Sequence, residues 1–269
     1  MLIEVNGALA YCYTGGKAFD AAKPTVVMVH GVLNDHSVWA LQSRYLANHG
    51  WNVLAVDLPG HCRSAGDAPA SVEQAADFIA ALLDAVGVDK AALVGHSWGS
   101  LIALEAAARL GARVSHLALV GTAYPMKVSP ALLESALNAP EKALRMVNQF
   151  SRSTLAPPSG AGFWVYGAGL ALGRRVLRGN RAVNLFHRGF AACDGYANGE
   201  RAMAAVQCPV LFALGAQDQM TTPKAAQSLI GAARAAGKAV RVVQLPVGHN
   251  QMSEAPDETL FALRDFLAA

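Results

Sequence analysis

Charged residues are scarce in this chain of 269 amino acids: Asp, Glu, Lys and Arg make up 15% of it, against roughly a quarter in an average globular protein. Aromatic residues reach only 7%, yet 53% of the chain is hydrophobic, which excludes disorder as its main state. The 22 basic and 19 acidic residues nearly balance, which disfavours binding to nucleic acid. The apolar excess must therefore lie in a membrane, in a core or in a pocket.

No long hydrophobic run fits a membrane span. The longest uncharged stretch, 153–173, has about the 20 residues that a span requires, but it contains Pro157, Pro158 and five glycines. We therefore expect this stretch to be buried or to line a pocket. The N-terminus also lacks the basic start and apolar run of a secretory signal, since Glu4 comes early.

Paired cysteines are absent as well. Cys12, Cys62, Cys193 and Cys208 are scattered, with no C-x-x-C pair and no Cys/His spacing typical of zinc. They predict reduced, mostly structural thiols in a cytoplasmic protein. The sequence supports no metal site and no nucleotide-binding fingerprint, so we expect no cofactor.

Strand and helix patterns alternate over residues 1–123. The first two strands are expected to form an antiparallel hairpin around Asn6-Gly7. Later strands are continuous apolar runs, which is typical of strands buried on both faces of a parallel sheet. The predicted strands are 2–5, 8–13, 25–30, 52–57, 91–95 and 114–121, and the predicted helices are 37–48, 72–86 and 98–110.

The alternation stops near Tyr124, where no clear strand follows until about Gln207, and it then resumes. This rhythm predicts an α/β fold: a mostly parallel, eight-stranded sheet with helices on both faces and a helical lid insertion. We assign 1–123 and 208–269 to the core and 124–207 to the lid. The resumed elements are strands 208–215 and 239–246 and helices 222–235 and 255–268.

The pentapeptide Gly95-His96-Ser97-Trp98-Gly99 has the form G-x-S-x-G and lies between a predicted strand and a predicted helix. A serine on such a tight turn has a strained backbone, so the residues two positions away must be small. The start of the helix also favours developing negative charge. The pattern predicts a nucleophilic serine, and the alternative is a serine that only caps the helix of an inactive domain.

A nucleophilic serine needs a base, and the base needs an orienting acid. Among eight histidines, His249 follows a predicted strand, as Asp218 follows the strand that ends at Gly215. Both are expected at the carboxyl edge of the sheet. We expect His30 to form local hydrogen bonds and His96 to line the pocket or support it.

These pieces together resemble the α/β-hydrolase fold superfamily over essentially the whole chain. The matching segments are His30-Gly31, 57–64, the turn at Ser97, Gly215-x-x-Asp218 and Gly248-His249. The resemblance implies that Ser97 is the nucleophile, His249 the base and Asp218 the acid.

Two further points follow from this resemblance. Some members place the acid after the strand before the lid, but 114–133 contains no Asp or Glu, which favours Asp218. The backbone N–H groups of Val32 and Trp98 are implied as the oxyanion hole.

Related enzyme classes fit less well. Prolyl aminopeptidases need lid carboxylates, and none occurs in 142–193. C–C bond hydrolases usually carry Trp after the catalytic His, where this chain has Asn250. Epoxide hydrolases and haloalkane dehalogenases use an Asp nucleophile at the position of Ser97.

The acid-free window 142–193 is rich in basic residues: Lys142, Arg145, Arg152, Arg174, Arg175, Arg178, Arg181 and Arg188. Beside them lies the apolar stretch 163–172, for which we expect an acyl pocket. The arginines either form a basic rim that attracts anionic substrates or belong to a solvated or subunit-contacting helix face. We favour the solvated or contacting face for the individual arginines.

The sequence therefore predicts a serine esterase that cleaves carboxylic esters of small to medium acyl chain through an acyl-enzyme. The expected partner is a small molecule with an apolar acyl group, and the chain could be a monomer or a homodimer. The alternatives are a C–C bond hydrolase, lactonase or perhydrolase with the same triad, or an inactive hydrolase-like binding protein.

Overall fold

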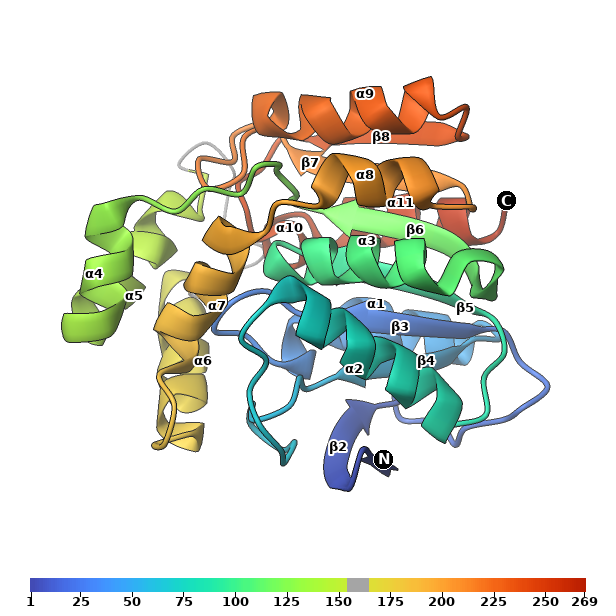
Figure 1. The fold of residues 1–269 in the computed structure, drawn as a ribbon, viewed down its shortest axis with the longest axis horizontal. Helices are drawn as coiled ribbons and strands as arrows, with labels where there is room; N and C mark the ends of the chain where they lie inside the picture. The colour runs from blue at the N-terminus through green and yellow to red at the C-terminus, as the bar shows by residue number, and fades with distance from the viewer. Residues whose placement is uncertain (154–164) are drawn as a thin grey trace.

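The computed structural model describes residues 1–153 and 165–269. Its centre is an eight-stranded sheet in the order β1-β2-β4-β3-β5-β6-β7-β8 (Figure 1). The hairpin β1–β2 joins β4 antiparallel, and the neighbours from β4 to β8 pair in parallel. The strands are Leu2–Val5 (β1), Ala8–Tyr13 (β2), Thr25–Val29 (β3), Asn52–Val56 (β4), Ala91–His96 (β5), Val114–Val120 (β6), Val210–Gly215 (β7) and Val240–Leu245 (β8).

Helices cover both faces of this sheet. In Figure 1, α2, α3, α8 and α9 lie on the near face, and α1 and α11 lie behind it. The α-helices are Ala40–Asn48 (α1), Val72–Ala85 (α2), Trp98–Leu110 (α3), Pro130–Asn138 (α4), Pro140–Phe150 (α5), Val165–Gly179 (α6), Leu185–Gly195 (α7), Gly199–Ala205 (α8), Gln227–Ala235 (α9), Gln251–Glu254 (α10) and Pro256–Leu267 (α11). The predicted mostly parallel α/β fold is confirmed.

Helix ends differ from the sequence prediction where local chemistry intervenes. Single 3₁₀ turns, His36–Trp39 and Pro223–Ala226, precede α1 and α9. The predicted closing helix 255–268 matches α11, and the short helix α10 that precedes it was not predicted; α10 ends before Pro256, whose ring has no N–H to continue it.

Four helices, α4 to α7, are grouped beyond one end of the sheet in Figure 1, and we call them the inserted helices. They lie between β6 and β7 in the chain, where the sequence predicts a lid. The next helix, α8, packs against α3 and α9 instead. The buried carboxylate of Glu105 on α3 accepts hydrogen bonds from Tyr196 and Asn198 just before α8, at 2.7 and 2.8 Å. The division at 124 and 207 stays a prediction.

An apolar cluster joins the inserted helices to the loop after β3. Leu144 of α5, Val176 of α6, and Phe186 and Phe190 of α7 are buried in it together with Leu33. Burying each such side chain contributes about 1.5–3 kcal/mol. Most of the uncharged stretch 153–173, including Phe163 and Trp164, lies outside the described residues, and its last part forms the start of α6. No helix in 1–153 or 165–269 is long and apolar enough to cross a bilayer.

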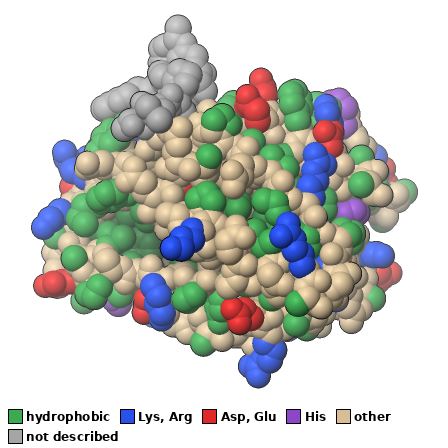
Figure 2. Space-filling view, turned by 90° about the horizontal axis from the view of Figure 1, so that it is seen from above, with side chains coloured by type: hydrophobic (Ala, Val, Ile, Leu, Met, Phe, Trp, Pro, Cys, Tyr) green, Lys and Arg blue, Asp and Glu red, His purple; other side chains and the backbone are tan. Residues whose placement is uncertain are grey.

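Ion pairs fix several arginines of the acid-free window. Arg145 and Arg174 both pair with Glu141, the residue directly before the window. Arg175 on α6 donates to Asp35 on the loop after β3, with Nε at 3.1 Å from Oδ2. Lys and Arg side chains are scattered over the face in Figure 2, some of them beside Asp or Glu, and form no continuous basic patch there.

Asp35 is 1% exposed and accepts several hydrogen bonds. The backbone N–H and hydroxyl of Ser37 donate to Oδ1 at 2.9 and 2.6 Å, while Arg175 donates to Oδ2. Burial alone would raise the pKa of Asp35, but these donors outweigh it and hold the pKa at about 2. The ionised carboxylate therefore ties α6 to the core.

The turn between β5 and α3 leaves no volume for side chains at two positions. A Cβ on Gly95 would lie 2.0 Å from the carbonyl oxygen of Gly99, and a Cβ on Gly99 would lie 2.4 Å from that of Val29. Contacts this short are forbidden, so both positions require glycine. The close approach sets the start of α3 against the end of β3.

Replacing Gly95 tests this constraint. We expect Gly95→Ala to lower the free energy of unfolding by at least about 3 kcal/mol, since the backbone must shift to admit the methyl group. The matched control is Gly231→Ala on α9, where nothing lies within 4 Å of the added Cβ. Gly231→Ala should instead stabilise the chain by about 0.5–1 kcal/mol. Urea unfolding measures both, and equal effects of the two substitutions would contradict the interpretation.

Acid titration of stability tests Asp35. Its folded pKa of about 2 lies below the ordinary value of 3.8, so its contribution is present above about pH 4 and disappears as the pH falls toward 2. Asp35→Asn should lower stability at pH 7 by about 2 kcal/mol and flatten the loss between pH 4 and pH 2. The control is Asp67→Asn at an exposed loop position, which should leave urea midpoints unchanged. An Asp35→Asn curve parallel to that of the wild type would refute the assignment.

Candidate active site

Ser97 lies on the turn between β5 and α3 with φ 54° and ψ −122°. Its N–H donates to the carbonyl oxygen of Val120 on β6 at 2.9 Å, which holds the turn against the sheet. A positive φ is costly for a residue with a side chain and is frequent at functional sites. Leu33, in the loop after β3, also has a positive φ of 57°. Ser97 and Leu33 line the same cavity.

Asp218 and His249 form a buried pair on neighbouring loops after β7 and β8. His249 Nδ1 lies 2.8 Å from Asp218 Oδ2, and the two residues are 6% and 3% exposed. Burial opposes the charge on Asp218, but His249 and Thr221 offset it and lower the pKa of the carboxyl below its ordinary value. The pair thus has an ionised carboxylate that orients the imidazole.

Thr221 completes this arrangement, and the sequence reasoning missed it. Its hydroxyl lies 2.7 Å from Asp218 Oδ2 and 3.0 Å from His249 Nδ1. The backbone N–H groups of Met220 and Thr221 donate to Asp218 Oδ1, both at 2.8 Å. The only available signal was a Thr three residues after Asp218, which does not distinguish this role from an ordinary turn.

One small cavity of about 70 Å³ brings the predicted residues together. Ser97, His249 and Val32 line it, with Asp218 behind His249. Trp98 does not line it with its side chain, which is buried in the core. As the first residue of α3, Trp98 has an N–H with no acceptor inside the helix. The geometry places Ser97, His249 and Val32 around one space, and Trp98 directly follows Ser97 in the chain.

A groove of about 730 Å³ adjoins the cavity. Arg152, Gly169 and Asn250 line both spaces, so one continues into the other. Leu41 and Leu172 add apolar side chains to the groove wall. A substrate could therefore extend from Ser97 into the groove.

Three other imidazoles support the site without joining the Asp218–His249 pair. His96 Nε2 lies 2.9 Å from the carbonyl oxygen of His249, as expected for a pocket-lining residue. His30 bonds locally: Nδ1 lies 2.8 Å from the oxygen of Gly31, and the N–H of Leu58 donates to Nε2 at 3.2 Å. Burial lowers the pKa of His61 and of His96 to about 3, so both rings stay neutral.

The loop of His249 is held by the chain segment that follows α5. The N–H of His249 donates to the carbonyl oxygen of Ser151 at 2.8 Å. The carboxylate of Glu254 accepts from the N–H groups of Ser153, Gly248 and Asn250, at 2.9, 3.2 and 3.1 Å. The position of the imidazole therefore depends on residues from both sides of the cavity.

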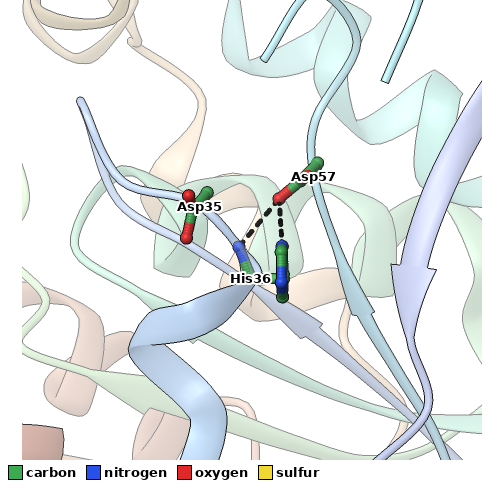
Figure 3. A group of neighbouring side chains, drawn as sticks. All are labelled: Asp35, His36 and Asp57. Atoms are coloured by element: carbon green, nitrogen blue, oxygen red, sulfur yellow. Dashed lines mark hydrogen bonds and ion pairs between the residues drawn. The ribbon is translucent and has the colours of Figure 1, made fainter. Parts of the chain in front are cut away.

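One group of side chains has the composition of a metal site. Asp35, His36 and Asp57 hold ligand atoms within 4.8 Å of one another. Figure 3 shows both dashed lines running from Asp57 to His36, where N–H and Nδ1 lie 2.9 and 2.8 Å from Oδ1. The other oxygen, Oδ2, accepts from the N–H of Arg63 at 3.2 Å. Because hydrogen-bond donors occupy the carboxylate oxygens of Asp57 and Asp35, we assign the group to stabilising these turns.

The four cysteines are unpaired and offer no alternative nucleophile at this site. Burial raises the pKa of Cys62 to about 12, which keeps its thiol protonated at neutral pH. Cys12, Cys193 and Cys208 are buried in the core cluster. Ser97 therefore stays the candidate nucleophile among the described residues that line the cavity.

Part of this chain is similar in sequence to several known proteins. The chain is similar to the dihydrolipoyllysine-residue acetyltransferase component of the acetoin cleaving system of Cupriavidus necator, with 36% identity over 119 residues, 44% of this chain and 30% of that protein. It is also similar to an epoxide hydrolase of Caballeronia sordidicola, with 37% identity over 90 residues, 32% of this chain and 27% of that protein. The chain thus spans less than a third of these relatives' length.

Similarity to solved structures extends over the whole fold. The enol-lactonase of Burkholderia xenovorans superposes with a TM-score of 0.80 and 24% identity, covering 100% of both chains. At that identity the superposition supports the fold alone. The family profile described as alpha/beta hydrolase fold matches residues 24–256, which include Ser97, Asp218 and His249. The resemblance read from the sequence is confirmed, and the chain belongs to the alpha/beta hydrolase fold family.

Proposed function

We propose that this hydrolase is a cofactor-free serine esterase that cleaves carboxylic esters of small to medium acyl chain. The observation that carries the proposal is the buried Asp218–His249 pair, with 2.8 Å between Oδ2 and Nδ1, beside a cavity lined by Ser97. An imidazole oriented in this way is a general base for a serine hydroxyl. No metal or nucleotide is required for this chemistry.

In the proposed mechanism His249 Nε2 accepts the proton of Ser97 as Oγ attacks the ester carbonyl. Asp218 holds the proton on Nδ1 and stabilises the imidazolium that forms. The alcohol leaves with a proton returned by His249, and an acyl-enzyme remains. Water, activated by the same imidazole, then attacks the acyl group and releases the acid.

The N–H groups of Val32 and Trp98 are the proposed oxyanion hole. Val32 lines the cavity, and Trp98 opens α3, where the helix dipole also favours negative charge. Losing one such donor costs about 3–4 kcal/mol of transition-state stabilisation in comparable enzymes. The inserted helices are the proposed lid, since Leu144 of α5 and Phe190 of α7 line the same cavity.

The epoxide hydrolase relative suggests a different reaction, which Ser97 disfavours. Epoxide opening in that class uses a carboxylate at the turn, and this chain has a hydroxyl there. The small cavity beside Ser97, about 70 Å³, supports a short acyl group. Esters of short carboxylic acids are therefore the proposed substrates.

Removing the hydroxyl of Ser97 tests the mechanism. Ser97→Ala should reduce turnover of p-nitrophenyl butyrate by at least roughly a thousandfold, because no acyl-enzyme can form. A fluorophosphonate should label the wild type rapidly and leave Ser97→Ala unlabelled. Ser100→Ala is the control and should be labelled like the wild type. The hydroxyl of Ser100 is hydrogen-bonded to the backbone carbonyl oxygen of Ser97 and to the hydroxyl of Thr122, so it is not expected to react. Full esterase turnover in Ser97→Ala would end the proposal.

The pH profile of kcat/KM provides a second test. Measured from about pH 8 to pH 5, kcat/KM should fall toward acid pH, because an imidazole base must be unprotonated to accept the serine proton. The acid limb should have a slope of one in the logarithmic plot, since His96 and His61, with pKa values of about 3, stay neutral over this range. Tryptophan fluorescence over the same range controls for unfolding. A flat profile, or a limb of slope two, would contradict a single imidazole base.

A further inference from the structure

Arg152 stands where the cavity of Ser97 meets the groove. It follows the last residue of α5, separated from Phe150 by Ser151, and its side chain lines both spaces. Ser97, His249 and Val32 line the cavity with it. A cationic side chain therefore faces the space in which the proposed substrate reacts.

The guanidinium of Arg152 lacks the partners that neighbouring arginines have. Its Nε and Nη1 are buried without a hydrogen-bond acceptor among the described residues. Arg145 and Arg174 pair with Glu141, and Arg175 pairs with Asp35. Arg152 therefore differs from these arginines, because two of its N–H-bearing nitrogens have no acceptor and could donate to a bound molecule.

Glu254, the acid whose charge acts on Arg152, does not supply that acceptor. Glu254 acts on Arg152 through its charge, but its oxygens accept from the backbone N–H groups of Ser153, Gly248 and Asn250. Burial lowers the pKa of Arg152 to about 10, so the group is still charged at neutral pH. The described residues that line the cavity and the groove include no Asp or Glu.

The guanidinium is also held closely against α6. A Cβ on Gly169 would lie 2.7 Å from Arg152 Nη2 and 2.4 Å from Asn148 Oδ1, so the absence of a side chain there makes room for Arg152. A buried, unpaired cation costs several kcal/mol unless an anion joins it. Planar guanidinium groups match carboxylates well, because two N–H groups can donate to two oxygens at once.

We propose that Arg152 binds a carboxylate on the substrate, so that the hydrolase acts on esters of short dicarboxylic acids. The ester carbonyl then lies at Ser97 while the far carboxylate lies at Arg152. The cavity of about 70 Å³ suits a short chain between the two groups. This inference rests on the proposed function, because it names the substrate class of the same site.

Two matched substrates test whether Arg152 binds a substrate carboxylate. They are p-nitrophenyl pentanoate and the mono-p-nitrophenyl ester of glutaric acid, which carries a carboxylate in place of the terminal methyl group. The wild type should prefer the glutarate ester in kcat/KM. Arg152→Gln should lower kcat/KM for the glutarate ester about 10- to 100-fold and change the pentanoate value less than about threefold. Arg152→Lys should recover part of the loss, because the charge returns without the planar geometry.

Arg145→Gln is the matched control, since Arg145 lies on α5, is 62% exposed in its side chain and pairs with Glu141. It should leave the preference unchanged. Arg152→Gln should unfold at the same temperature as the wild type or a higher one, because a charge without a partner is removed. A structural arginine would instead show a lower melting temperature and an equal loss on both esters, and that result would overturn the proposal.

Failure of the proposed esterase function would give a different result from failure of the Arg152 proposal. A wild type that hydrolyses neither ester and does not react with a fluorophosphonate is no serine esterase. Calorimetric titration with glutarate then still tests Arg152 directly: the wild type should bind glutarate and Arg152→Gln should bind it at least about tenfold more weakly. Equal binding by the two proteins, or none by either, would refute a carboxylate site at Arg152.

Discussion

The contact between Gly95 and Gly99 is the constraint on which the candidate site depends. Because neither residue has a Cβ, the start of α3 can rest against the carbonyl groups at the end of β3. On the turn that this close packing allows, Ser97 has its positive φ and lines the cavity. The loop with Val32 leaves β3 at the same place, so nucleophile and proposed oxyanion donors share one rigid support. The loops that follow β7 and β8 carry Asp218 and His249, and His249 lines the same cavity.

Much of this arrangement could be predicted from the sequence. Buried parallel strands are continuous apolar runs, so their positions were evident, and Ser97, Asp218 and His249 each follow such a run. Residues whose role depends on three-dimensional neighbours were not predictable. Thr221 gave no signal, because only the fold brings its hydroxyl to both members of the pair. The segment 222–235 was predicted as one helix, whereas it begins with the 3₁₀ turn Pro223–Ala226 before α9.

The roles of the arginines also could not be predicted from the sequence. In the sequence, eight basic residues of an acid-free window look equivalent. In the fold, Glu141 lies just outside that window and serves two of them, while Asp35 from a distant loop serves a third. What distinguishes Arg152 is the lack of such a partner beside a cavity. Charge composition left open whether these arginines form an anion-binding rim or a solvated face, and only the pairing of each guanidinium identifies the residue on which the proposal rests.

The hydrogen bond from His249 to Ser151 has a consequence for recombining this chain with its relatives. Ser151 belongs by sequence to the segment between β6 and β7, yet its carbonyl oxygen accepts the backbone N–H of the residue proposed as the base. A chimera that exchanges this whole segment for that of another hydrolase would change the residues that line the cavity and would also displace the carbonyl group that holds His249. The exchangeable unit therefore has to end before Ser151 or bring an equivalent carbonyl with it. Boundaries drawn from strand and helix order alone would separate His249 from the acceptor of its backbone N–H.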